Sequence, residues 1–312
     1  MIDVPGFHLT LAPEDQAQKE FLAFELSQAG VEMEIRSGAH FAHPVRLRWE
    51  FPNCGKETQL KVQIGKNTKV VVVEELASKV ESGKWKVENP WTHNAEVFLE
   101  DGAEAEFISI NALSADVVLD MKQRSQLGDN AKVSWRNVTL GGRQVDHYLE
   151  SELRGADSVS EVDWMFYAKD EEKYRLTVRN VFLGRHGGGE ITMKGVAEEK
   201  GHVRCDGMIK IGLTGGETDT YLTQDVLMLD KTAKVDAIPG LEIKTNDVKA
   251  SHSATVSRVT EEDLFYFAAR GIVEREARRM FVEGFLGDLV AKISNGNVKE
   301  ELLVAIKEKY GS

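Results

Sequence analysis

The chain has 312 residues, with 39 Lys and Arg against 51 Asp and Glu, which gives a formal net charge of −12. This acidic balance argues against a nucleic-acid or anionic-membrane partner, because both select for clustered basic side chains. A chain of this length can bury roughly three quarters of the surface of its unfolded form, so its core needs no disulfide or metal staple.

The two cysteines, Cys54 and Cys205, and an N-terminus without a basic start or a long apolar run predict a cytoplasmic protein with reduced thiols. A first segment, residues 1–40, is expected to hold one short helix. Pro13 suits the first helical position, and Phe21 and Phe24 follow at helical spacing before Gly30. We therefore expect a helix from Pro13 to about residue 29.

The second segment, residues 41–259, has the two-residue period of β-strands. Val45, Leu47 and Trp49 alternate with charged residues, which predicts a strand with one buried face. Further strands are expected at 60–64, 70–73, 95–99, 105–110, 133–140, 174–182, 191–196 and 208–211. The stretch DVKASHSATV, residues 247–256, is harder to interpret, because β-branched residues flank a polar centre at His252.

A turn pattern recurs within this segment. It reads IGKNTKV (64–70), LGDNAKV (127–133), LRGADSV (153–159) and LDKTAKV (229–235), with LEDGAEA (99–105) as a looser copy. Counting that copy in order, the first three intervals are 35, 28 and 26 residues, about the length of one coil of a β-solenoid. A β-sandwich would show the same alternation, but the few prolines and the evenly spaced turns favour the solenoid.

The third segment, residues 260–312, changes to a helical pattern. Thr260 to Asp263 has the form of a capping box, and Gly271 suits the end of a short helix. A second helix is expected from about Val273, with an apolar face, and a third from Asn297 as its cap. Apolar faces of this kind are more often intradomain core than a docking site.

At the junction of the last two segments the sequence resembles a known family. Residues 238–286, IPGLEIKTNDVKASHSATVSRVTEEDLFYFAARGIVEREARRMFVEGFL, closely resemble the C-terminal core of the SufB and SufD proteins, the scaffolds for iron–sulfur cluster assembly. The β region from about residue 45 is similar to that family more loosely. The resemblance implies a mainly β protein, with a right-handed parallel β-helix between a short N-terminal helix and a C-terminal helical segment.

The resemblance also implies partners. The C-terminal helices would dock a SufC-like ABC ATPase, and the scaffold subunits would pair through their late strands. The chain lacks the long N-terminal helical extension of the bacterial subunits and is similar to a minimal single-scaffold version, so we expect a homodimer within a 2:2 complex. The docking residues expected from this resemblance are Leu264, Phe265, Tyr266, Arg270, Gly271, Ala277, Met280, Phe281 and Phe285.

His252 lies where SufD-like proteins carry a histidine implicated in cluster assembly, and a neutral imidazole is a competent iron ligand. Ser251 and Ser253 would then orient it. The alternative is a histidine hydrogen-bonded at a strand edge. Two thiolates usual in the family are missing, because Ala250 and Gln224 stand at their positions.

The resemblance leaves Cys205 as the better thiol for a transient cluster, expected to be of the 4Fe–4S type, because it lies in the late strands. Glu190, Asp206 and Asp225 are the candidate carboxylate ligands. Cys205 shares strand parity with Val203, which points it into the core unless a bulge intervenes, so a purely structural thiol is the alternative.

We therefore expect an assembly scaffold without catalytic turnover of its own, with ATP hydrolysis left to the partner. Two alternatives remain. One is a β-helical carbohydrate-active enzyme that uses carboxylates such as Glu161 and Asp163, and the other is a structural adaptor of the ATPase that holds no cluster.

Overall fold

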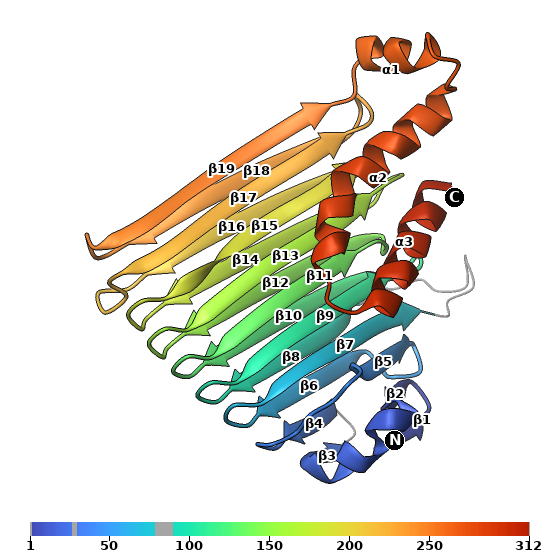
Figure 1. Ribbon diagram of the computed structural model, residues 1–312. Coiled ribbons are helices and arrows are strands. Elements are labelled where there is room, and N and C mark those ends of the chain that lie inside the picture. Colours follow the sequence, from blue (N-terminus) through green and yellow to red (C-terminus); the bar gives the residue numbers. More distant parts are fainter. Residues whose placement is uncertain (1, 27–29, 79–89, 312) are drawn as a thin grey trace.

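The computed structural model describes residues 2–26, 30–78 and 90–311. Within them the chain forms a parallel β-solenoid, with three helices after its last strand (Figure 1). The chain passes alternately between two sheets, so neighbours within a sheet are two strands apart in sequence. The solenoid prediction is confirmed, because a sandwich of antiparallel strands would not give this parallel pairing.

The two sheets are named here by their strands. Sheet A contains β1 (Ile2–Val4), β2 (Phe7–Thr10), β5 (Val45–Phe51), β7 (Lys69–Ser78), β9 (Glu104–Ala112), β11 (Lys132–Thr139), β13 (Val159–Ala168), β15 (Gly188–Ala197), β17 (Thr218–Met228) and β19 (Val248–Arg258). Sheet B contains β3 (Leu22–Leu26), β4 (Gly30–Ile35), β6 (Glu57–Ile64), β8 (Trp91–Leu99), β10 (Val118–Leu127), β12 (Gln144–Leu153), β14 (Lys173–Phe182), β16 (His202–Ile211) and β18 (Lys234–Ile243).

The recurring turn pattern gives the coil length directly. Ile64 pairs with Leu99, Leu99 with Leu127, and Leu127 with Leu153, so the intervals of 35, 28 and 26 residues are successive coils. The copy at 229–235 differs, because it follows β17 of sheet A and turns toward sheet B at the opposite edge. One short pattern therefore serves both edges of the solenoid.

The turns that end the sheet B strands stack on one another as the strands do. Asn67 and Asn130 have φ values of 53° and 56°, a left-handed conformation that asparagine tolerates better than most residues. The amide of Asn67 donates to the carbonyl of Asp101 (3.1 Å), and that of Asn130 to the carbonyl of Ala156 (2.8 Å). Each turn thus donates a backbone hydrogen bond to the next coil.

Five strands of the second segment, β10, β12, β13, β17 and β18, are not predicted from the sequence, and neither are β1, β2 and β4 of the first segment. In β10 and β12 the reason is that polar side chains occupy the inward row. Gln123 and His147 are fully buried, and their Oε1 and Nε2 atoms lie 2.9 Å apart. Ser125 donates to Ser151 across the same two strands at 2.9 Å. Paired polar groups inside the solenoid hide the apolar alternation on which the prediction depends.

The helix predicted from Pro13 to residue 29 is wrong beyond Phe21. Pro13–Phe21 forms a 3₁₀ helix, Leu22–Leu26 is strand β3, antiparallel to β4, and residues 27–29 lie outside the described residues. Leu22, Phe24 and Leu26 also alternate with period two, and pairing with β4 satisfies backbone groups at the end of sheet B. The carboxylate of Asp15, within the 3₁₀ helix, accepts two backbone N–H groups at 2.8 Å.

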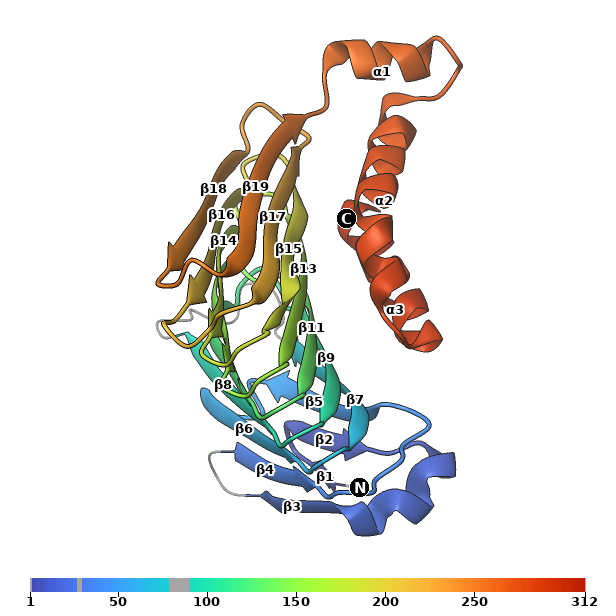
Figure 2. The same cartoon turned by 60° about the vertical axis from the view of Figure 1, so that its left-hand side comes forward.

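The three C-terminal helices are confirmed as α1 (Glu261–Ala268), α2 (Glu274–Lys292) and α3 (Gly296–Gly311). One detail is wrong: the side chain of Asn295, not Asn297, caps α3 by accepting the Val298 amide at 3.1 Å. Helices α2 and α3 lie against the outer face of sheet A (Figure 2). No helix of the described chain is long and apolar enough to span a membrane.

Apolar contact with these helices explains why β11 and β13 are buried on both faces. In β12 and β14 of sheet B, by contrast, buried residues alternate with more exposed ones. The buried contact consists of Val73, Ile108, Ile110, Val138, Leu140, Met165, Tyr167, Val196, Leu227, Leu229 and Val259 with Val282, Leu286, Leu289, Val290, Ile293, Val298, Leu302 and Ile306. The helices thus complete a second apolar layer outside the solenoid.

The buried His147 makes the stability of the fold depend on pH. Burial lowers its pKa from 6.5 to about 3, so the unfolded chain binds a proton here that the folded chain excludes. Its contribution is fully present above pH 6.5 and is lost as the pH falls toward 3, by at most about 1.4 kcal/mol per pH unit. Between pH 6.5 and 5, the free energy of unfolding measured with urea should therefore fall by about 2 kcal/mol less in His147→Gln than in the parent. Parallel stability curves for the two proteins would contradict this.

Candidate functional site

At its C-terminal end the solenoid finishes in two strands that each have a neighbour on one side only within the described chain. In the described chain β19 pairs only with β17, and β18 only with β16. Most side chains of β18 and β19 are exposed or half-buried, whereas earlier coils bury their inward rows completely. This open end, at the upper left of Figure 1, contains the histidine singled out by the sequence.

His252 lies in the inward row of the last coil. The stretch 247–256 falls almost wholly in strand β19, and His252 pairs with Leu222, which is fully buried. His252 itself is exposed because no coil of the described chain covers it. Ser251 and Ser253 point to the other face of the strand, since successive side chains alternate. The prediction that these serines orient the imidazole is therefore wrong.

Cys205 is buried one coil further in. It pairs with Leu176 and Ala237 in an uninterrupted parallel ladder, so the Asp206–Gly207 bulge that would turn the thiol outward is not formed. The side chain is fully buried, and this burial raises the pKa of its thiol. The group is thus a protonated thiol in this conformation, whereas thiolate is the form that binds metal.

Gln224 joins Cys205 from the facing sheet. Its amide nitrogen donates to the backbone carbonyl of Cys205 at 3.3 Å and lies 3.5 Å from the sulfur of Met193. The Gln224 side chain is fully buried, and its Oε1 has no hydrogen-bond partner among the described residues. Two positions that the sequence connects with cluster binding therefore meet inside the solenoid.

The three candidate carboxylates do not join them. Glu190 and Asp225 alternate with buried residues of sheet A and so face its outer side, and Asp206 faces the outer side of sheet B. Across residues 2–26, 30–78 and 90–311, no group of three or more His, Cys, Asp or Glu side chains is arranged to hold a metal ion. One copy of the chain, in this conformation, does not gather the predicted ligands.

Helix α1 begins at the predicted capping box. The hydroxyl of Thr260 accepts the amide of Asp263 at 3.1 Å, and the carboxylate of Asp263 accepts the amide of Thr260 at 2.9 Å. No residue of α1 is buried, and the helix projects from the end of the solenoid (Figure 2). It is held to α2 by an edge-on contact between Phe267 and Phe281, with ring centroids 5.4 Å apart.

The structure divides the nine expected docking residues into two groups. Ala277 is fully buried, and Leu264, Phe281 and Phe285 pack against the apolar layer under the helices. The others are exposed at the surface: Phe265 (73% exposed), Tyr266, Met280, Arg270, whose guanidinium stacks on the Tyr266 ring at 3.5 Å, and Gly271, with a φ of 78°.

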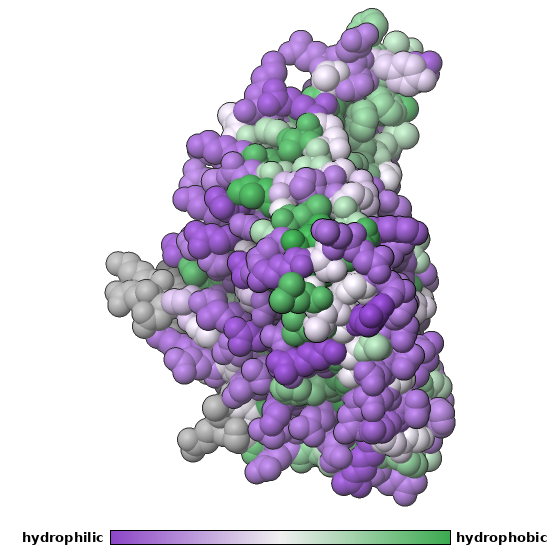
Figure 3. All heavy atoms as spheres, turned by 90° about the vertical axis from the view of Figure 1, so that its left-hand side faces the viewer, coloured by the Kyte–Doolittle hydropathy of each residue, from purple (hydrophilic) through white to green (hydrophobic). Residues whose placement is uncertain are grey.

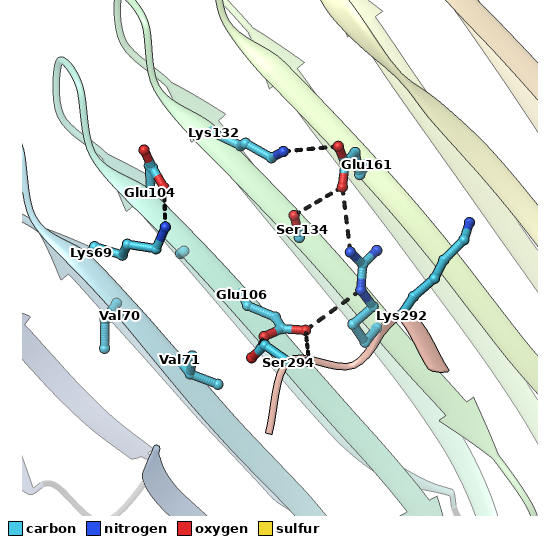
Figure 4. A pocket seen from close by; sticks show the side chains of 12 residues that line it. Lys69, Val70, Val71, Glu104, Glu106, Lys132, Ser134, Glu161, Lys292 and Ser294 are labelled. Atoms are coloured by element: carbon cyan, nitrogen blue, oxygen red, sulfur yellow. Dashed lines mark hydrogen bonds and ion pairs between the residues drawn. The ribbon is translucent and has the colours of Figure 1, made fainter. Parts of the chain in front are cut away.

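A network of ion pairs and hydrogen bonds fastens the link between α2 and α3 to sheet A, and Figure 4 shows the part in which Ser294 of the link contacts Glu106. Arg136, with its side chain 9% exposed, contacts Glu106, Glu161 and Asp163. Lys292 at the end of α2 reaches Asp163 at 2.8 Å. Glu161 and Asp163 are thus held by basic partners under the helices, a structural role that leaves them poorly placed as glycosidase carboxylates.

Beside this network lies a groove of about 250 Å³ between the strands and the α2–α3 link. Its basic side chains are already paired: Lys69 contacts Glu104, and Lys132 contacts Glu161, both at 2.9 Å. Ser294 of the link closes the groove by donating its amide to Glu106 at 3.1 Å. The groove is therefore part of the anchor of the helices.

Comparison with known proteins identifies the family. The SUF system FeS cluster assembly, SufBD core domain, matches residues 52–285, most of the solenoid with α1 and much of α2. The chain belongs to the SufBD family. This establishes an iron–sulfur cluster assembly protein and confirms the resemblance seen in the sequence.

Several SufBD relatives are similar along much of the chain. An iron–sulfur cluster assembly SufBD family protein of Mycobacterium leprae is 26% identical over 302 residues, which cover 92% of this chain and 74% of the relative. The iron–sulfur cluster assembly protein SufD of Escherichia coli is 27% identical over 59% of this chain and 43% of its own length. SufD of Bacillus subtilis is 27% identical over 69% of this chain and 49% of its own length. The chain thus spans less than half of either SufD protein.

The ion-pair network predicts how firmly the helices are held. Replacing Asp163 by Asn should lower the free energy of unfolding by about 3 kcal/mol, because the change leaves Arg136 buried with a deficit of negative charge. Urea unfolding measures the total, and faster hydrogen exchange in α2 and α3 would locate it. The matched control is Asp146→Asn, whose ion pair with Arg175 is exposed and should contribute less than about 1 kcal/mol. Equal losses in the two variants would contradict the anchoring role.

Proposed function

We propose that this SufBD-family protein is a scaffold on which an iron–sulfur cluster is assembled as cargo, at a junction between two copies of the chain. The observation that carries this proposal is the open end of the solenoid. Two free strand edges lie there, together with inward-facing His252 and, one coil deeper, Cys205. A SufC-like ABC ATPase is the proposed partner, and ATP hydrolysis belongs to it.

The free edges support the pairing of two copies. An unpaired edge strand presents a row of backbone donors and acceptors, which soluble proteins normally cover. At this end Ile238 is 39% exposed and Val256 46%. A second copy related by a twofold axis would cover these side chains and complete both hydrogen-bond ladders.

Cys205 and His252 are the ligands of the proposal. Two copies supply two thiolates and two imidazoles, which equals the number of iron sites in a 4Fe–4S cargo. Glu190, Asp206 and Asp225 lie on outer faces, so they could contribute only after the strand ends rearrange. Because Cys205 is buried and protonated, the junction must open before its thiol can ionise and bind iron.

The helices provide a route by which the ATPase could drive that opening. Phe265 and Tyr266 on α1, with Met280 on α2, are exposed apolar side chains of the kind that anchor interfaces. Only Val259 and Thr260 separate the end of β19 from α1. A movement of α1 imposed by the partner would therefore pull directly on the strand that carries His252, as a rigid-body coupling.

Binding of the ATPase tests the docking surface. Phe265→Ala should weaken the affinity for the SufC-like subunit about 30-fold, the loss expected for a central aromatic anchor, as measured by calorimetry. The matched control is Leu303→Ala, which removes an exposed apolar side chain from α3 and should leave the affinity unchanged. Equal affinities of the Phe265 variant and the parent would place docking elsewhere.

Anaerobic reconstitution with iron and sulfide tests the ligands. Cys205→Ser and His252→Ala should each lose at least half of the bound iron and sulfide and the brown colour of the cluster, because each variant removes two of four ligands from the dimer. Cys54→Ser, which changes a half-buried thiol far from the open end, is the control. Parent-like binding by both variants would eliminate these ligands. ATPase binding without any iron in the parent would indicate an adaptor.

A further inference from the structure

Buried polar atoms without a partner gather in the middle coils of the solenoid. On the outside, hydrophilic side chains are expected, and they dominate the face that carries the turns of sheet B (Figure 3). Inside, six polar atoms on strands β7 to β12 have no hydrogen-bond partner in the described chain: Glu74 Oε2, Ser109 Oγ, Asn111 Oδ1, Gln123 Nε2, Asn137 Oδ1 and His147 Nδ1. Each of these residues is at most 1% exposed. Buried polar atoms of folded proteins nearly always have a partner, so this group indicates a ligand inside the coils.

Three of these atoms belong to neighbours in one inward row of sheet A. Ser109 of β9 pairs with Glu74 of β7 on one side and with Asn137 of β11 on the other. Neighbouring strands lie about 4.8 Å apart, so a ligand the size of water beside Ser109 is within reach of oxygen atoms from all three side chains. The row thus presents a set of oxygens from three successive coils.

This coil has more room at its centre than the coils on either side. Further along the solenoid, Gln224 and Gly207 face each other across the interior, since a Cβ on Gly207 would lie 2.8 Å from Gln224 Nε2. The strand registers place Ser109 and Ala95 at the equivalent positions four coils earlier. Each of these two side chains is smaller than both residues that pair with it. Small residues therefore face each other where the unpartnered oxygens lie.

The hydrogen bonds already made in this region define what the ligand must supply. Oε1 of Glu74 lies 2.9 Å from His93 Nε2, which leaves Oε2 without a partner. Nδ2 of Asn137 donates to Gln123 at 2.9 Å, which leaves Oδ1. The ligand must therefore donate to both oxygens, and the hydroxyl of Ser109 can donate to it in return. A water molecule can do all of this at once, because it both donates and accepts.

We propose that the solenoid encloses a water-binding site formed by Glu74, Ser109 and Asn137. The row is apolar on either side of these residues, because Leu47 pairs with Glu74 and Trp164 pairs with Asn137, and both are fully buried. The bound water gives each of the three side chains the partner that it lacks and connects strands β7, β9 and β11 from the inside. It thereby removes the cost of burying these oxygens unpaired.

The site is separate from the open end of the solenoid. Trp164 and Met193, both fully buried, lie between Asn137 and Gln224 in the same row. The water therefore does not line a route to Gln224 or to Cys205 beside it. Because the site lies inside one copy of the platform, it goes beyond the proposed scaffold function and does not depend on the pairing of two copies.

A crystal structure of the full chain, at a resolution that shows ordered water, tests the site directly. Density is expected within about 3.2 Å of Ser109 Oγ and of Glu74 Oε2 or Asn137 Oδ1. No density there, or a direct hydrogen bond from Ser109 to either neighbour, overturns the proposal. Density at the shorter distances of about 2.0–2.6 Å that are typical of bound Mg²⁺ or Ca²⁺ overturns it in favour of a cation.

Magnetic relaxation dispersion of the water oxygen nucleus counts the long-lived internal waters in solution. Ser109→Val puts a branched apolar group into the site, so this variant should lose at least one such water and unfold at a lower urea concentration than the parent. Ser109→Ala leaves the space open and should keep the parent's count of long-lived waters.

The matched control is Ser125→Ala, because the Ser125 hydroxyl already donates to Ser151 at 2.9 Å inside the same solenoid. This change should lower the urea midpoint without changing the water count. If Ser109→Val keeps the parent's water count, or unfolds at a higher urea concentration, the Ser109 hydroxyl lies in a dry core and the proposal is wrong. If the valine variant does not fold, the crystal structure of the parent decides.

Discussion

The structure depends on backbone pairing between successive coils. From β6 to β17 each strand uses its N–H and C=O groups on two parallel neighbours, and the turns continue the same ladder at the edge, as Asn67 and Asn130 show. Pairing of this kind is satisfied only where another coil follows. The last coil has none within the described chain, so β18 and β19 each keep one free edge, at the end of the solenoid that carries His252 and leads into α1.

The C-terminal helices divide mechanically into a fixed part and an exposed part. Helices α2 and α3 share a buried apolar layer with sheet A and are fastened by Arg136, Asp163 and Lys292. Helix α1 buries no residue and follows directly from β19. Local stability follows buried contact, so α1 is the element that a partner can move at least cost. Because α1 follows β19 so closely, a movement of α1 would act first on the open end.

The sequence predicts the repeat well because apolar residues that end the sheet B strands recur at the coil length, from Ile64 to Leu153. It also predicts the capping box at Thr260, which depends on local chemistry alone. It fails where a tertiary contact overrides the local pattern. Strands such as β10 carry inward polar groups that only a facing strand satisfies, and β3 is extended only because β4 lies beside it.

The candidate site was only half predictable for a related reason. Strand parity indicates correctly that Cys205 faces inward, but parity cannot say which residue faces it across the interior, and Gln224 is found there. The two proposed ligands thus differ in access, since His252 is exposed and Cys205 is buried. A protonated, covered thiol is protected from oxidants and stray metal, because both react with thiolate. Iron that first meets the imidazoles at the surface would gain the thiolates only when the last coil opens, so assembly would be coupled to the movement that exposes Cys205.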